Sequence, residues 1–481
     1  MSRSKITSSS VDASIPNTLP VADNITASTL EGGVSTTTNI TFTNASALQN
    51  TTFDWSIANI SSSSTITGTA ANGDVTDVSS ATFTFTCGAT IGATSTFDVV
   101  VTDSNGYSDS KTFTLTTAAV FDPTDPYGTY GNGSDGDATS LSYVGIYVSS
   151  TSTSSITVGS ASGFSSGDIV LLVQHQDGTL TNGTHEYLKI DSISGTTINF
   201  TSNLQNSYAV DQYQSTSDAQ VTAIYRVPQF DNLTISSTQT LSDWNGYHGG
   251  VIVVWVKDTL TINDGGSIHQ DGAGFRGGIA EQRSDGASNK CGENQKTYSD
   301  YTRSGVGNGG GGGLANVPGV SGQGHGGGGA HANAGGTDGS NVDGLGGNAW
   351  GSQDLTTHLG FGGAGGAGGD DYGNIGGDGG AGGGIVVINA ATIVMNGTSR
   401  ISADGDNGTR PTSGGGGAGG AGGSVFINCD SITGNGTNSI LADRGTAGNG
   451  ASAGNQGSVG RIHIRGTQSG SFTITPSAYT G

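Results

Sequence analysis

Runs of glycine constrain the fold of this chain more than any other feature. The segment "GGAGGAGGD" at 362–370 returns almost unchanged at 417–423 and in looser form at 376–384. Gly accounts for 87 of the 481 residues. Segments with so few side chains have no apolar face to bury, so any order in them depends on backbone hydrogen bonds.

The glycine tracts have a period of three, which matches an extended helix with three residues per turn. Collagen shares this period but needs abundant proline, and Pro occurs only 8 times here. Polyglycine helices of the same type can pack side by side through their N–H and C=O groups, because no Cβ keeps them apart. Flexible glycine linkers are the alternative, but linkers usually mix Gly with Ser and lack a strict period. The tracts therefore predict packed polyglycine II helices.

Strand-like segments between the tracts repeat one layout, with apolar residues, a polar turn, a short Ser/Arg-Ile unit and an Asp-containing turn. The copies begin at Gly250, Gly384 and Gly423, and a terminal fragment begins at Gly460. Repeated short strands separated by turns are typical of a β-solenoid or a stacked β-prism. We therefore expect residues 229–481 to form one glycine-rich repeat domain.

The first part of the chain alternates polar and apolar residues with period two. The clearest runs are 37–43, 81–86, 96–102 and 111–116, and a hairpin turn signal lies at 103–107. This spacing predicts a two-sheet, immunoglobulin-like β-sandwich over 21–120. Residues 1–20 are polar and are expected to form an N-terminal arm.

A second β module is predicted at 140–228. The segments 163–173 and 186–200 indicate strand, long hairpin, strand, tight turn and strand, which is typical of a small β-barrel-like module. Residues 121–139 contain two prolines and many turn formers, so they are interpreted as a linker. The whole chain is thus predicted to be all-β.

The net charge and the cysteine content limit which partners and cofactors the chain is expected to bind. The net charge of −22 argues against nucleic acid, because phosphate binding needs clustered Lys and Arg. Cys87, Cys291 and Cys429 show no zinc spacing and an odd count, so no metal site, disulfide framework or cofactor is expected. Acidic residues of the linker could hold a calcium ion, but a solvated linker is the favoured interpretation. The linker acids concerned are Asp122, Asp125, Asp135 and Asp137.

A histidine-containing hairpin offers a second candidate for metal binding or catalysis. His175, His185 and Glu186 lie near each other in sequence, but no third ligand has suitable spacing. A solvated hairpin is the favoured interpretation. The N-terminus has no apolar region behind its basic residues, and no long apolar run follows, so neither a secretion signal nor a membrane span is expected.

The tracts at 308–313, 324–331, 360–369 and 414–423 resemble those of the glycine-rich receptor-binding adhesins of some phage tail fibres. They are also similar to glycine-rich surface proteins of bacteria. The resemblance covers about the last 250 residues. It implies a sandwich of polyglycine helices, with the loops between the tracts contacting a host receptor.

Recognition is expected where side chains reappear between the tracts, because Tyr and Trp on loops give a large contact area and can stack on sugars. Local capping of the glycine layer is the alternative role for each side chain. The receptor-binding candidates are Arg283, Lys290, Lys296, Tyr298, Tyr301, Arg303, Trp350, His358 and Tyr372.

Catalysis is not expected, and the chain is predicted not to be an enzyme. Asp404 and Asp406 lie two apart and Asp443 occupies the equivalent place in the next copy, a spacing that could suit a glycosidase. The repeat explains them better as turn residues that bind backbone amides.

Three functions are therefore weighed. The first is a virion fibre or adhesin on the virion surface, or an extracellular one, that joins other subunits through its N-terminal domains and binds a host glycan or protein. The second is a cellular surface adhesin or filament subunit. The third is a polysaccharide depolymerase, and for all three a homo-oligomer is left open.

Overall fold

The computed structural model divides the chain into two compact units, Met1–Val120 and Phe121–Gly481. In the first unit it describes the eight strands named below. In the second unit it describes residues 121–177, 182–210, 220–283, 286–294, 301–305, 307–315, 324–337, 341–371, 374–411, 413–448 and 455–480.

The described residues form strands, turns and extended segments without any helix, which confirms the all-β prediction. It follows that this part of the chain offers no helix that could cross a membrane. The expected boundaries of the arm, linker and two C-terminal domains stay predictions.

Strands of the first unit form two sheets. One sheet has the order β1-β3-β6, and the other has the order β2-β8-β7-β4-β5. The strands are β1 (Val21–Ile25), β2 (Thr29–Glu31), β3 (Ser35–Thr43), β4 (Thr52–Ala58), β5 (Gly73–Thr76), β6 (Ser80–Thr86), β7 (Thr94–Asp103) and β8 (Ser108–Ala118). All four alternating runs lie within strands, because period-two sequences bury one face of a sheet. The strands on either side of the predicted hairpin turn, β7 and β8, pair antiparallel, while residues 104–107 lie outside the described residues.

Six antiparallel strands of the second unit close into a barrel with the order β10-β13-β12-β11-β14-β9. They are β9 (Gly145–Thr151), β10 (Ser155–Val158), β11 (Ile169–Gln176), β12 (His185–Ser194), β13 (Thr197–Phe200) and β14 (Val221–Arg226). Val170 and Leu172 of β11 belong to the barrel core. Leu171 and Val173 on the other face join a different core, so every residue of β11 is buried.

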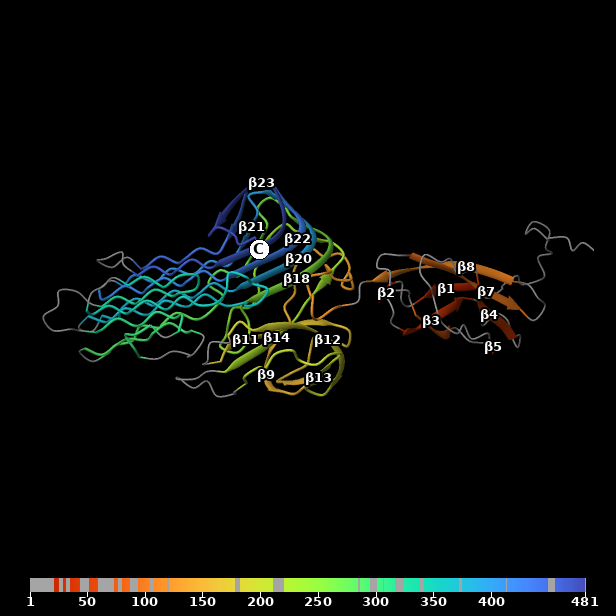
Figure 1. Cartoon of the computed structure of the whole chain (residues 1–481), viewed down its shortest axis with the longest axis horizontal. Helices are drawn as coiled ribbons and strands as arrows, with labels where there is room; N and C mark the ends of the chain where they lie inside the picture. Colours follow the sequence, from red (N-terminus) through yellow and green to blue (C-terminus); the bar gives the residue numbers. More distant parts are fainter. Residues whose placement is uncertain are drawn as a thin grey trace, which may run out of the picture. The chain divides into compact units, whose positions relative to one another are not determined.

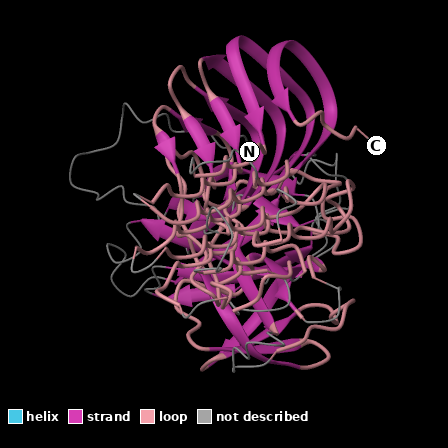
Figure 2. Cartoon of the chain, turned by 90° about the vertical axis from the view of Figure 1, so that its left-hand side faces the viewer, coloured by secondary structure: helices cyan, strands magenta, loops and turns pink. Residues whose placement is uncertain are grey.

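The remaining strands form one parallel sheet that curls around its own core (Figure 2). They are β15 (Gln229–Phe230), β16 (Leu233–Ile235), β17 (Thr238–Gln239), β18 (Val251–Ile262), β19 (Ser267–His269), β20 (Ile385–Gly397), β21 (Arg400–Ser402), β22 (Ser424–Leu441) and β23 (Arg461–Thr475). Val251, Ile385, Ser424 and Arg461 are aligned across neighbouring strands. The repeat copies identified in the sequence therefore stack in register.

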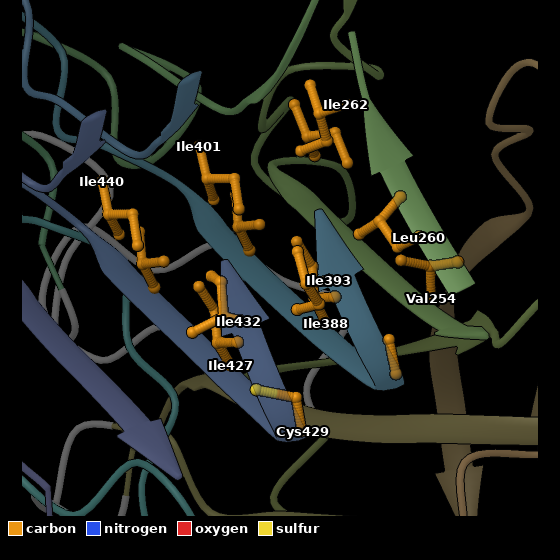
Figure 3. Close-up of a cluster of buried hydrophobic side chains, with 14 of the residues drawn as sticks. Val254, Leu260, Ile262, Ile388, Ile393, Ile401, Ile427, Cys429, Ile432 and Ile440 are labelled. Carbon is orange, nitrogen blue, oxygen red and sulfur yellow. The ribbon is translucent and has the colours of Figure 1, made fainter. Parts of the chain in front are cut away.

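Isoleucines of successive copies pack on one another inside the curled sheet (Figure 3). Ile388 and Ile427 pair across β20 and β22, and Ile401 and Ile440 pair across β21 and β22. All four side chains are fully buried. Burial of this kind contributes roughly 1.5–3 kcal/mol per side chain, so this core is the main apolar support of the sheet.

The sheet and the barrel share a second core. Ile252, Val254 and Val256 of β18 face the inside of the curled sheet. Val251, Val253 and Trp255 alternate with them and pack with Leu171 and Val173 of β11. Because both faces of β18 are covered, its first six residues form a continuous apolar run rather than an alternating one.

Glycine tracts run side by side as extended segments next to the strands (Figure 1). Gly362, Gly365 and Gly368 donate amide hydrogen bonds to the carbonyls of residues 383, 380 and 377. Residues 363, 366 and 369 donate to residues 330, 327 and 324, and residues 364 and 367 donate to residues 293 and 290. Each third residue therefore bonds to the same neighbouring segment.

Close approach of these segments explains why the tract is glycine at two positions in three. A Cβ added at Gly363 or Gly366 would overlap the carbonyl oxygen of Asn308 or Gly311. Ala364 and Ala367, at the third position, have room for a methyl group and are fully buried. Backbone packing thus sets the Gly-Gly-Ala pattern.

Candidate functional site

Three of the predicted recognition residues meet in one cluster. The guanidinium carbon of Arg283 lies 3.8 Å from the centre of the Tyr301 ring, and the Lys290 ammonium lies 5.4 Å from it. Glu281 accepts a 2.5 Å hydrogen bond from the Tyr301 hydroxyl and forms a 2.5 Å ion pair with Lys290. We call Glu281, Arg283, Lys290 and Tyr301 the aromatic cluster.

The aromatic cluster has one carboxylate and two cationic side chains, and Tyr301 is 42% exposed. Hydrogen bonds from Lys290 and Tyr301 hold the pKa of Glu281 below its ordinary value, and the Glu281 carboxylate raises the pKa of Lys290. The carboxylate and the ammonium are therefore both charged near neutral pH. Such an arrangement offers a polar partner an aromatic surface together with hydrogen-bond donors and acceptors.

Asn289 connects the aromatic cluster to the glycine tracts. Its side-chain amide is buried, donating 3.0 Å to the carbonyl of Gly368 and 2.9 Å to that of Glu281. Its Oδ1 accepts from the Glu281 amide over 3.1 Å. The loop is thus held on its platform by a satisfied buried amide.

The other described candidates lie outside the cluster and contact the scaffold. The Nε of Arg303 donates 2.6 Å to the carbonyl of Asp343. The Trp350 ring stacks on His331 at 6.3 Å and packs on the backbone of Gly360. His358 is half-buried beside Thr357, and burial lowers its pKa. Lys296, Tyr298 and Tyr372 lie outside the described residues.

Aspartates of successive repeats form a ladder at one turn of the curled sheet. The Asp404 amide donates 2.8 Å to the Asp271 carboxylate, and the Asp443 amide donates 2.6 Å to the Asp404 carboxylate. Arg400 pairs with Asp271 at 2.8 Å and with Asp404 at 2.5 Å. As the repeat suggested, Asp404 and Asp443 act as turn residues: the Asp404 carboxylate accepts from the Asp443 amide, and the Asp443 carboxylate accepts from the Arg444 amide at 2.8 Å.

These carboxylates nevertheless have opposed pKa shifts. Burial raises the pKa of Asp271, but hydrogen bonds from His269 and the Asp404 amide, with the Arg400 charge, bring it below its ordinary value. Burial raises the pKa of Asp404, and burial with the charges of Asp271 and Asp243 raises that of Asp406. One ionised and one more readily protonated carboxylate therefore lie close together.

The histidine hairpin is buried, so its interpretation as a solvated hairpin is wrong for His175 and Glu186. His175 stacks on Phe361 with ring centres 4.5 Å apart, and its Nε2 lies 2.8 Å from the Tyr225 hydroxyl. Glu186 accepts hydrogen bonds from the amides of residues 205 and 206. No local sequence signal predicts this burial, because the residues that cover His175 are distant in the chain.

Glu293 is a structurally important residue that the sequence did not indicate. Its buried carboxylate accepts bonds from Arg276 at 2.9 and 3.1 Å, from the Trp244 indole at 3.1 Å and from Gln176 at 3.5 Å. The donors come from the end of β11 and from two other segments. Glu293 therefore connects the barrel, the curled sheet and the glycine-rich segment.

Acids of the predicted linker contact protein groups. Asp135 pairs with Arg226 at 2.6 Å, and Asp137 accepts a 3.1 Å bond from the Asn232 amide. Asp122 accepts bonds from Thr124. No group of three or more potential metal-ligating side chains occurs among the described residues. The expectation that the chain needs no cofactor stays a prediction.

No known protein family and no curated protein matches the sequence. A tailspike of Acinetobacter baumannii bacteriophage AP22, in complex with A. baumannii capsular saccharide, is 10% identical and covers 70% of this chain, with a TM-score of 0.17. The tailspike of Pseudomonas phage LKA1 is 12% identical and also covers 70%, with a TM-score of 0.16. The chain spans 58% and 63% of these two structures.

A third similar structure is the secreted serine protease VesC from Vibrio cholerae, which is 14% identical over 41% of this chain and 47% of that one, with a TM-score of 0.14. Two of the three similar structures are thus phage tailspikes. The prediction that the chain is not an enzyme is not supported by the comparisons, in which two of the similar structures are phage tailspikes, one of them in complex with a capsular saccharide.

Proposed function

We propose that the chain is an attachment protein of a virion or cell surface that binds a glycan or protein on its host. One observation carries this proposal: the amides of residues 362–369 bond in turn to three neighbouring segments, with a period of three. A platform held together by its backbone leaves the few charged and aromatic side chains of this region for recognition.

Packing of the tracts as polyglycine II helices is part of the proposal. This helix has three residues per turn, so residues three apart face the same neighbour. Gly363, Gly366 and Gly369 behave in this way. Each hydrogen bond contributes about 1 kcal/mol net, and together they offset the entropy lost on ordering glycine. The curled sheet then serves as a β-solenoid or β-prism base for the tracts.

The first unit is proposed as an immunoglobulin-like sandwich that joins the chain to other virion or filament subunits. Its three- and five-stranded sheets supply the two layers that such a sandwich needs. This arrangement assigns attachment to the N-terminal part and recognition to the glycine-rich part, at a virion surface or outside the cell.

The aromatic cluster is the proposed contact to the host. Tyr301 provides a partly exposed ring, while Arg283 and Lys290 provide donors that are already oriented by contacts within the cluster. Oriented side chains lose less entropy on binding than free ones, which favours affinity.

The proposal is tested by adding the labelled full chain to a panel of bacterial cells and to isolated capsular polysaccharides. Saturable binding that unlabelled chain displaces is expected, and its absence from every surface would overturn the proposal. Tyr301→Ala should weaken binding several-fold. Tyr247→Ala is the matched control, because Tyr247 is 40% exposed but lies outside the aromatic cluster.

Cleavage of a polysaccharide is a second candidate, favoured by the opposed pKa shifts of Asp271 and Asp404. Glycoside hydrolysis uses one protonated and one ionised carboxyl group. Incubation with the polysaccharide that the chain binds should then generate new reducing ends. Asp404→Asn should abolish cleavage but leave binding intact, whereas cleavage that survives this substitution would exclude these carboxylates.

A further inference from the structure

A polar pocket of about 440 Å³ lies where the loop after Trp350 meets β23 and the C-terminal segment. Its lining includes Asp354 and Thr356 from the loop, His463 and Arg465 from β23, and Tyr479 from the C-terminal segment. The volume falls within the range that accommodates small ligands. None of these side chains belongs to the aromatic cluster or to the aspartate ladder.

The base of the pocket is rigid. His463 is 2% exposed, and its ring lies between those of Phe426 and Tyr479, with centres 5.0 and 4.8 Å away. Its Nδ1 accepts a 3.2 Å hydrogen bond from the Leu355 amide. The backbone of Tyr479 is bonded to Ile462 and to Ile464 of β23. The aromatic side chains of the pocket are therefore already in place before any ligand binds.

The pocket also contains polar groups whose bonding capacity is not used within the described residues. Asp354 accepts bonds from Thr356 through Oδ1, while no such bond is made to Oδ2, and its side chain is 39% exposed. Arg465 is exposed and forms no ion pair in the described part of the chain.

We infer that this pocket binds a neutral saccharide, with the Asp354 carboxylate accepting from sugar hydroxyls, Arg465 donating to sugar oxygens and the Tyr479 ring packing against a sugar face. This inference rests on the proposed attachment function and adds to it a ligand class and a second site, separate from the aromatic cluster. Sugar hydroxyls both donate and accept hydrogen bonds, so a carboxylate beside a guanidinium matches adjacent hydroxyls. Sugar rings also carry apolar C–H faces that pack on aromatic rings.

A neutral sugar fits this pocket better than an acidic one. An anionic group beside Arg465 would also lie near the Asp354 carboxylate, and the net charge of the chain is −22. The anionic group and the Asp354 carboxylate would repel each other, because they carry like charges. A neutral ring avoids this repulsion and still uses both polar side chains.

The experiment measures binding of the full chain to an array of neutral oligosaccharides and of carboxylated or sulfated ones. Arg465→Ala and Asp354→Asn should each weaken binding to the neutral saccharides about tenfold. Arg444→Ala and Asp258→Asn are the matched controls, because both residues are exposed and lie outside the pocket. Asp354→Asn retains an oxygen that can accept the Thr356 bonds, so the loop should stay folded.

The outcomes separate the pocket from the proposed function. Binding of neutral saccharides that is lost in both pocket variants and kept in both controls supports the inference. Neutral binding that the pocket variants leave unchanged would overturn this site while leaving the attachment function in place. Binding only to acidic saccharides would overturn the ligand class, and no binding to any saccharide or cell would overturn both proposals.

Discussion

The amide of Gly366 donates a 2.9 Å hydrogen bond to the carbonyl of Gly327, at a point where a Cβ on residue 366 would overlap the carbonyl oxygen of Gly311. The two contacts leave no room for a side chain. Gly366→Ala is therefore expected to lower the free energy of unfolding by about 1–3 kcal/mol, because neighbouring backbone must move apart. Amide hydrogen exchange in residues 363–369 should become faster than in the unsubstituted chain.

Ala367→Gly is the matched control for this substitution. It removes one buried methyl group without adding a clash, so exchange at residues 363–369 should change less than in Gly366→Ala. Equal exchange in the two variants, or unprotected tracts in the unsubstituted chain, would contradict the close packing described here.

The apolar core of the curled sheet gives a second prediction. Ile427→Ala should reduce the free energy of unfolding by about 2–5 kcal/mol, because Ile427 is fully buried between neighbouring repeats. Ile375→Ala should change it by less than about 0.5 kcal/mol, since Ile375 is 52% exposed. Urea unfolding followed by circular dichroism measures both, and similar losses would show that burial does not decide the outcome.

Glu293 gives a third prediction, because one buried carboxylate satisfies donors from three segments. Glu293→Ala should destabilise the chain by about 1–3 kcal/mol, because the buried Trp244 indole and the buried Gln176 amide lose an acceptor. Lys257→Ala, which breaks an exposed pair with Asp231, should cost no more than about 1 kcal/mol. Calorimetry of both variants checks this, and equal melting temperatures would refute a connecting role for Glu293.

Buried histidines predict a loss of stability in mild acid. Burial lowers the pKa of His175 to about 3 and that of His331 to about 3, whereas a histidine in an unfolded chain has a pKa of about 6.5. Between these values the unfolded chain binds protons that the folded chain does not. The free energy of unfolding should therefore fall as the pH falls from about 6.5 towards 4, by about 1.4 kcal/mol per pH unit for each histidine.

His175→Phe tests this assignment, since a phenyl ring can keep the stacking on Phe361 but cannot bind a proton. Its unfolding free energy should depend less steeply on pH between 6.5 and 4 than that of the unsubstituted chain. Lys257→Ala should leave the pH dependence unchanged, as lysine does not titrate in this window. An unaltered slope in His175→Phe would assign the acid sensitivity to other groups.

Local repeats made part of this fold predictable. The alignment of Val251, Ile385, Ser424 and Arg461 follows from segments of similar sequence, and stacking places equivalent residues side by side. The period of three likewise led to the prediction that the tracts pack side by side, and residues three apart donate to the same neighbouring segment. Their packing as polyglycine II helices stays a prediction. Both signals lie within short stretches of the chain, so one sequence is enough to find them.

Contacts between distant segments could not be predicted in the same way. Glu293 meets Gln176, and Asp354 meets His463 across 109 positions, without any periodic signal. Arg283 and Lys290 contact Tyr301 within one short stretch of the chain. The high local density of charged and aromatic residues was therefore sufficient to predict this cluster. Trp350 was predicted from the same signal, an aromatic residue between glycine tracts. Its ring instead packs on the scaffold, against the backbone of Gly360.

The threefold bonding of residues 362–369 limits how such a platform can grow. If three residues were added to a tract, each following amide would still face the segment that it bonds to now. If one or two were added, each following amide would face a different segment. The bonding pattern is therefore kept only when a tract is lengthened or shortened in steps of three, with matching steps in the adjoining segments. Loops between tracts are free of that rule, which lets their sequence vary while the platform keeps its form.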